Sequence, residues 1–159
     1  MLVNNILPTA HLAVTYIVWW IASRYLGGDI WSLFLAIFFG VLIDGDVVLF
    51  GSRHRQSILH SVVIWPILGI ILYIVHVDYF WTPIFAVIHI AMDSLDWGVY
   101  ALYPFSSNIF GPRILARRSR LNPGKNMIIE FFVEYVSNRM FLVAEIVLCL
   151  SALTIFLFA

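Results

Sequence analysis

Long apolar runs with very few charges are the feature that most restricts how this chain can fold. Five of them, at roughly 9–26, 30–50, 57–77, 79–103 and 139–159, come close to the ~20 helical residues that cross a bilayer. Hydrophobic residues make up 62% of the 159 residues and charged residues 11%, whereas about a quarter of a typical soluble domain is charged. Lipid leaves only helices or closed barrels as spanning structures. We therefore expect an all-α integral membrane protein, a bundle of about five transmembrane helices.

The connections between these runs predict three parts and an orientation. Residues 1–105 form a four-helix membrane core, 106–138 a basic loop with a short amphipathic interfacial segment, and 139–159 a C-terminal transmembrane helix. The basic residues lie on the side of the N-terminus and the 104–138 loop, except for Arg24. The positive-inside rule then predicts a protein of the cytoplasmic membrane, with the N-terminus and that loop in the cytoplasm.

Charge and cysteine content exclude some classes of partner and of cross-link. The formal net charge is zero, which argues against nucleic acid as a partner. The basic run at 113–120 is more simply an anchor near anionic lipid. Cys149 is the single cysteine, so no disulfide can form within the chain.

Ionisable residues inside these apolar runs are the main clue to function. The segment 85–105 contains His89, Asp93 and Asp96, whose i, i+4, i+7 spacing places them on one face of a helix. With consecutive helices antiparallel, the polar residues of the other runs reach the same level, near the cytoplasmic side. The side chains expected to meet there are His11, Asp44, Asp46, His54, His60, His89, Asp93 and Asp96.

Histidine nitrogen and carboxylate oxygen together are the ligands that zinc, manganese and iron prefer. A divalent cation would also supply the opposite charge that buried Asp44, Asp46 and Asp93 need. Gly45 indicates a local break in the helix, which would let Asp44 and Asp46 point at one site. We expect one or two divalent metal ions. Zinc is the metal that we favour, and manganese is the alternative.

The chain resembles the YdjM-like (LexA-regulated) family of membrane-bound metal-dependent hydrolases. The matching features are His11, "LIDGD" at 42–46, "HRQSILHS" at 54–61 and "HIAMDSLDWGVYALYPF" at 89–105, in the family's order. The match covers about two thirds of the chain. It implies a divalent metal site and a hydrolase activity.

These observations give a set of candidate site residues. Asp44, His60, His89 and Asp93 are expected to hold the metal, and Asp46 or Asp96 to position or deprotonate the attacking water. Arg55 would steady an anionic substrate, since arginine is a preferred fork for phosphate. The full list of candidate metal ligands is His11, Asp44, Asp46, His54, His60, His89 and Asp93.

The expected activity is hydrolysis of a lipid or lipid-linked phosphoester at the cytoplasmic leaflet, with membrane lipids as partners. Other interpretations stay open at this point. The chain could be an ion or metal transporter, or a non-catalytic subunit of a larger membrane complex, and it could form a homo-oligomer. At single residues, Asp44 and Asp46 could cap a helix end, His89 and Asp93 could bond between helices, and Glu145 could pair with Arg139 or contact the site.

Overall fold

The computed structural model describes residues 8–46, 56–96, 98–111 and 139–158. Its regular elements are helical, as expected. They are α1 (Pro8–Leu26), α2 (Ile30–Val41), the 3₁₀ helix η1 (Leu42–Asp46), η3 (Ile58–His60), α4 (Ile64–Val75), η4 (Val77–Tyr79), α5 (Ile84–Asp96) and α7 (Arg139–Phe158). The predicted loop and amphipathic segment lie mostly outside the described residues.

The prediction of a transmembrane bundle is wrong. Across the described ranges, no helix has both the length and the apolar character needed to span a membrane. Three of the predicted spans contain helices of only 12, 12 and 13 residues, α2, α4 and α5. At 1.5 Å per residue these helices are about 18–20 Å long, well short of the ~30 Å hydrocarbon layer. The assignment to the cytoplasmic membrane, the orientation of the N-terminus and the 104–138 loop, and the lipid at a cytoplasmic leaflet are withdrawn with it.

Local sequence explains why these runs do not continue as single helices. Helix α5 begins at Ile84, directly after Pro83, which has no backbone N–H to continue a helix from the preceding turn. Helix α2 ends at Val41 and the chain continues as the 3₁₀ helix η1. The break expected near Gly45 is therefore present.

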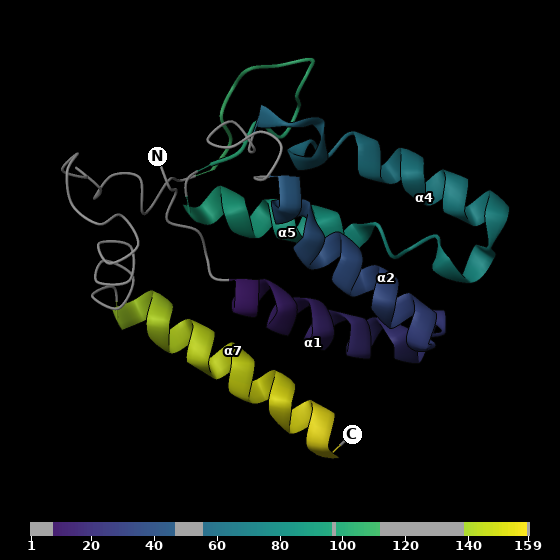
Figure 1. Ribbon diagram of the computed structural model, residues 1–159, viewed down its shortest axis with the longest axis vertical. Helices are drawn as coiled ribbons and strands as arrows, with labels where there is room; N and C mark the ends of the chain where they lie inside the picture. Colours follow the sequence, from purple (N-terminus) through teal and green to yellow (C-terminus); the bar gives the residue numbers. More distant parts are fainter. Residues whose placement is uncertain (1–7, 47–55, 97, 112–138, 159) are drawn as a thin grey trace.

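The helices pack in a simple order. Helix α1 packs between α2 and α7, α2 packs on α5, and α5 also packs on α4 (Figure 1). Helices α7 and α4 therefore lie at opposite edges of the arrangement. The end of α2, followed by η1, reaches α5, and this contact brings the acidic η1 segment close to the histidine-bearing helix.

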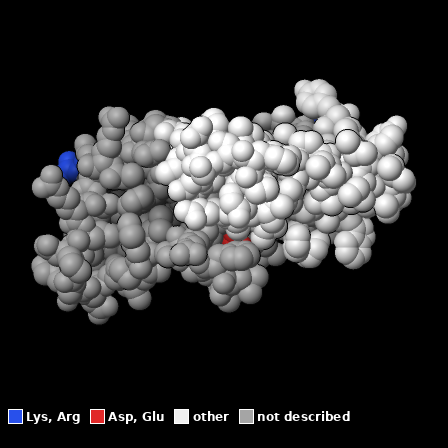
Figure 2. All heavy atoms as spheres, turned by 90° about the horizontal axis from the view of Figure 1, so that it is seen from above, with Lys and Arg blue, Asp and Glu red and all other residues white. Residues whose placement is uncertain are grey.

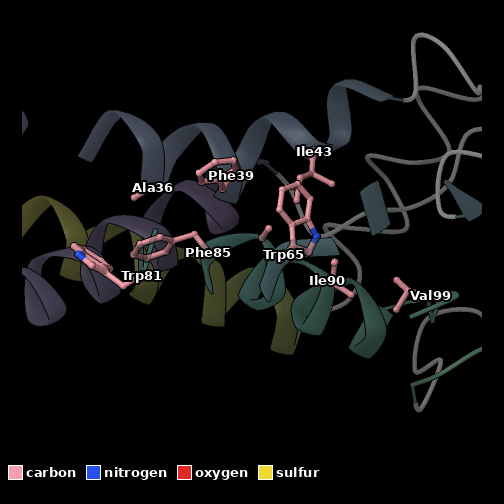
Figure 3. Packing of buried hydrophobic residues seen from close by; sticks show 9 residues of the cluster. Ala36, Phe39, Ile43, Trp65, Trp81, Phe85, Ile90 and Val99 are labelled. Atoms are coloured by element: carbon pink, nitrogen blue, oxygen red, sulfur yellow. The ribbon is translucent and has the colours of Figure 1, made fainter. Parts of the chain in front are cut away.

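A compact aromatic and aliphatic cluster joins α2, α4 and α5 (Figure 3). Phe39 of α2 meets Trp65 of α4 edge to face, with ring centroids 5.6 Å apart. Phe85 and Ile90 of α5 are 0% and 2% exposed. These contacts fix α5 against α2, which determines where the polar side chains of α5 point.

Few charged side chains show on the described surface. In the view of Figure 2 that surface is almost entirely uncharged, with one small area of carboxylate. Among the described acids, Asp46, Asp93 and Glu145 are buried. Burial of carboxylates needs partners of opposite charge or hydrogen-bond donors, and the arrangement around Asp93 shows what those partners are.

Candidate metal centre

Four side chains from three elements converge at one point. They are Asp44 of η1, His60 of η3, and His89 and Asp93 of α5. One ligand atom from each lies within 4.8 Å of the other three. His89 and Asp93 are four residues apart on a helix and so share a face. Asp44 lies in the 3₁₀ helix into which the chain changes after Val41.

The spacing of the donor atoms matches the coordination shell of a small cation. Nε2 of His89 lies 3.3 Å from Oδ1 of Asp44 and 3.9 Å from Oδ2 of Asp93. Nε2 of His60 lies 3.8 Å from the same Asp44 oxygen and 3.6 Å from the same Asp93 oxygen. Ligands at 2.0–2.2 Å in a tetrahedral zinc site are about 3.3–3.6 Å apart. The four histidine–carboxylate separations are close to this range, and the whole set of donors lies within 4.8 Å.

The inner nitrogen of each histidine has a partner that orients the ring. Nδ1 of His89 donates to the Gly40 carbonyl at 2.9 Å, because a carbonyl oxygen can only accept. Nδ1 of His60 lies 3.2 Å from Oδ2 of Asp46. In both rings Nε2 faces the cluster. Metal-binding histidines are commonly held in this way through the other ring nitrogen.

Burial makes this arrangement costly without a bound cation. His60, His89 and Asp93 are at most 1% exposed, while the Asp44 side chain is 20% exposed. Nε2 of His89 and Oδ1 of Asp44 make no hydrogen bond within the described residues. Buried polar atoms in native proteins nearly always have a partner. A divalent cation would satisfy these donor atoms together, so the residues fit such an ion.

The electrostatics point the same way. Burial lowers the pKa of His60, but contacts with the carboxylates of Asp44, Asp46 and Asp93 outweigh burial and raise that pKa to about 10. Burial raises the pKa of Asp44, but His60 and His89 hold it well below its usual range. Without an ion, the carboxylates thus keep positive charge on the neighbouring imidazole. A divalent cation would take that place.

The other candidate residues are distributed around this cluster. Asp46 contacts His60 from behind and also accepts a hydrogen bond from Ser57 Oγ. His11 contacts Asp93 at 3.4 Å. His54 and Arg55 lie outside the described residues, as does the Asp96 side chain at the end of α5.

Glu145 is not one of the four donors. It lies on α7, is 7% exposed, and its Oε1 accepts a hydrogen bond of 2.7 Å from Thr9 Oγ1 on α1. The side chain thus joins α1 to α7. This contact is different from the two that the sequence suggested, with Arg139 or with the site.

Two groups that orient the histidines were not foreseen from the sequence. Ser57 stands three residues before His60. A polar residue so close to a predicted ligand could have indicated a hydrogen-bond partner near that ligand. The Gly40 carbonyl is a backbone group, so the residue type does not indicate that it binds a histidine. The glycine itself does indicate a close contact between helices. A Cβ at Gly40 would lie 2.2 Å from Thr15 Oγ1, so α1 and α2 approach closely there. A glycine within an apolar helix often marks such an approach.

Comparison of the chain with protein-family models, with curated proteins and with solved structures gave no match. The resemblance to the YdjM-like hydrolases therefore stays a prediction. The buried cluster of Asp44, His60, His89 and Asp93, which can bind a metal ion, stands on the geometry alone.

Proposed function

We propose that the chain is a metal-dependent hydrolase whose divalent cation binds to Asp44, His60, His89 and Asp93. Zinc is the cation that we favour. The observation that supports this most strongly is the convergence of two imidazole nitrogens and two carboxylate oxygens within 4.8 Å in a largely buried site. Two nitrogen and two oxygen ligands suit zinc, and also manganese if water completes a larger shell.

The contacts of the described residues support a role for each of them. His60 and His89 present Nε2, and Asp46 and Gly40 hold the two rings in that orientation. Because Asp46 is engaged with His60 and Ser57, we assign it the role of orienting His60, and the role of general base falls to Asp96 by elimination. Arg55 remains the candidate for binding an anionic substrate.

Asp44 marks the side from which a substrate can reach the site. Its side chain is 20% exposed, whereas those of His60, His89 and Asp93 are buried. A bound cation would polarise a phosphoryl or carbonyl oxygen and generate a hydroxide nucleophile near neutral pH. The residues on the buried side keep their positions and exclude water. The substrate class that we propose is an ester or phosphoester.

A structural ion is the second candidate, and one observation favours it. Four protein donors without an open position are typical of structural zinc, whereas catalytic zinc usually keeps one position for water. The chain would then serve as a non-catalytic subunit with a metal-stabilised fold. The partial exposure of Asp44 supports the catalytic proposal, since a carboxylate in contact with solvent can give up its position to water or substrate.

The test combines metal content with hydrolysis. Purified protein is loaded with zinc or manganese, freed of excess metal, and assayed with bis-p-nitrophenyl phosphate, p-nitrophenyl phosphate and p-nitrophenyl acetate. We expect a retained ion and hydrolysis of at least one of these, both lost in the double variant His89→Ala/Asp93→Ala. A retained ion without hydrolysis would support the structural role, and no retained ion would end both proposals.

A further inference from the structure

In the described part of the chain, His11 is a buried histidine whose ring nitrogens are not satisfied by hydrogen bonds. It lies on α1, is 1% exposed, and neither of its ring nitrogens makes a hydrogen bond within the described residues. A buried imidazole nitrogen without a hydrogen bond has lost its contact with water and gained no replacement. Its ring stacks on that of His89, with centroids 4.1 Å apart and planes at 27°. His11 therefore lies against the four-donor cluster without belonging to it.

Asp93 has a different neighbour at each of its two oxygens. Oδ2 faces the four-donor cluster, 3.6 Å from Nε2 of His60 and 3.9 Å from Nε2 of His89. Oδ1 lies 3.4 Å from Nε2 of His11. A carboxylate placed in this way can bind two cations, one on each oxygen.

We infer that His11 and Oδ1 of Asp93 bind a second divalent cation, next to the first and joined to it through the Asp93 carboxylate. The 3.4 Å between Nε2 of His11 and Oδ1 of Asp93 is the separation of two neighbouring ligands about 2.1 Å from one zinc ion. The inference rests on the proposed function, because the second ion shares Asp93 with the first.

The pair of ions narrows the substrate class. Two described protein donors leave most of the second ion's coordination shell open to water or substrate. Paired ions about 3.5–4 Å apart are the arrangement suited to phosphoester hydrolysis, where both the attacking and the leaving oxygen need stabilisation. The structure thus favours a phosphoester over a carboxylic ester, and His11 is the residue that distinguishes the two-ion site from a one-ion site.

The experiment counts ions in matched variants. Wild-type protein, His11→Gln and His76→Ala are loaded with zinc, freed of excess metal and analysed by mass spectrometry for zinc per chain. Glutamine keeps most of the side-chain volume between α1 and α5, and His76 is a surface histidine whose side chain is 52% exposed. We expect two ions in the wild type and in His76→Ala, and one ion in His11→Gln with an unchanged circular dichroism spectrum.

A second readout tests whether the two ions share a ligand. With manganese in place of zinc, two ions joined by a carboxylate give an exchange-coupled electron paramagnetic resonance spectrum, and His11→Gln should give the spectrum of an isolated ion. One ion in the wild type would overturn this inference and leave the proposed function standing. Two ions in His11→Gln would overturn it as well, and no ion in the wild type would overturn both. Loss of both ions in a folded His11→Gln would show that His11 belongs to the first ion instead, which also overturns the inference.

Discussion

Within the described residues, acids and histidines meet in two places, and these differ in almost every respect. At the four-donor cluster, His60, His89 and Asp93 are buried, and one ligand atom of each lies within 4.8 Å of the others and of Asp44. At the other place, near η4, the side chains of His76 and Asp78 are 52% and 68% exposed and 3.7 Å apart. Asp29, beside them, accepts hydrogen bonds from the Ser32 N–H at 2.8 Å and from the Tyr79 hydroxyl at 2.9 Å.

The difference shows which feature identifies a metal site. The residue types are the same, so the presence of His and Asp does not distinguish the two places. What differs is that water and hydrogen bonds satisfy the groups near η4, whereas burial deprives the four-donor cluster of water. The predictions below change one group at the four-donor cluster and a matched group near η4.

The largest effect is expected from Asp93→Ala. Asp93 contributes to the four-donor set and is completely buried, so its loss should weaken zinc affinity by more than about 100-fold. Asp78→Ala removes an exposed carboxylate and should leave affinity unchanged. Isothermal titration with zinc in the presence of a competing chelator measures both. Equal affinity in the two variants would remove the distinction between the two places.

The next effect concerns the group behind His60. Asp46→Asn keeps the shape of the side chain but removes the charge that contacts Nδ1 of His60 at 3.2 Å. Partners of metal-binding histidines are worth about 10–100-fold in metal affinity, and we expect a loss in that range. Asp29→Asn is the matched change near η4 and should have no effect on zinc. A loss smaller than about threefold in Asp46→Asn would show that the contact does not support the ligand.

A smaller effect is expected from Gly40→Ala, which acts through the backbone. The added Cβ would lie 2.2 Å from Thr15 Oγ1, so either the buried Thr15 side chain or α2 has to move, and a shift of α2 would take the Gly40 carbonyl with it. Overpacking of this kind costs about 1–3 kcal/mol of stability. Zinc affinity should fall too, because that carbonyl orients His89. Adding Thr15→Ala relieves the closest contact and should restore part of both losses, as measured by chemical denaturation and zinc titration.

The smallest effect is a pH dependence near η4. The backbone N–H of Ser32 holds the pKa of Asp29 below its ordinary value of 3.8. Asp29 therefore stabilises the fold above that value, and its contribution is lost as pH falls through the lowered pKa. The difference in unfolding free energy between wild type and Asp29→Asn should be present at pH 7 and vanish in acid. A difference that is the same at both pH values would contradict the role given to this carboxylate.

Asp44, His60, His89 and Asp93 lie together as the sequence suggested, but short-range spacing accounts only for the pair His89 and Asp93. His89 and Asp93 lie one helical turn apart, and Gly45 indicated the break that frees Asp44. The groups that orient the histidines depend on tertiary contacts: the Gly40 carbonyl reaches His89 only because α2 packs on α5.

The helical character of the described elements was easier to predict than their lengths. Counting apolar residues treats each run as one continuous helix, which is how the transmembrane bundle came to be predicted. The run at 79–103 includes Pro83, and the run at 30–50 changes to a 3₁₀ helix after Val41. Apolar composition records burial of any kind, in a protein core as well as in lipid. It does not determine helix length.

The most direct test of the four-donor cluster is X-ray absorption spectroscopy of the zinc-loaded protein. The expected spectrum has a first shell of nitrogen and oxygen at about 2.0–2.1 Å, with the outer-shell scattering of imidazole, and loses that scattering in His60→Ala/His89→Ala. A shell that contains sulfur, which would place the ion at Cys149, or a shell of oxygen without imidazole would contradict a metal centre built on Asp44, His60, His89 and Asp93.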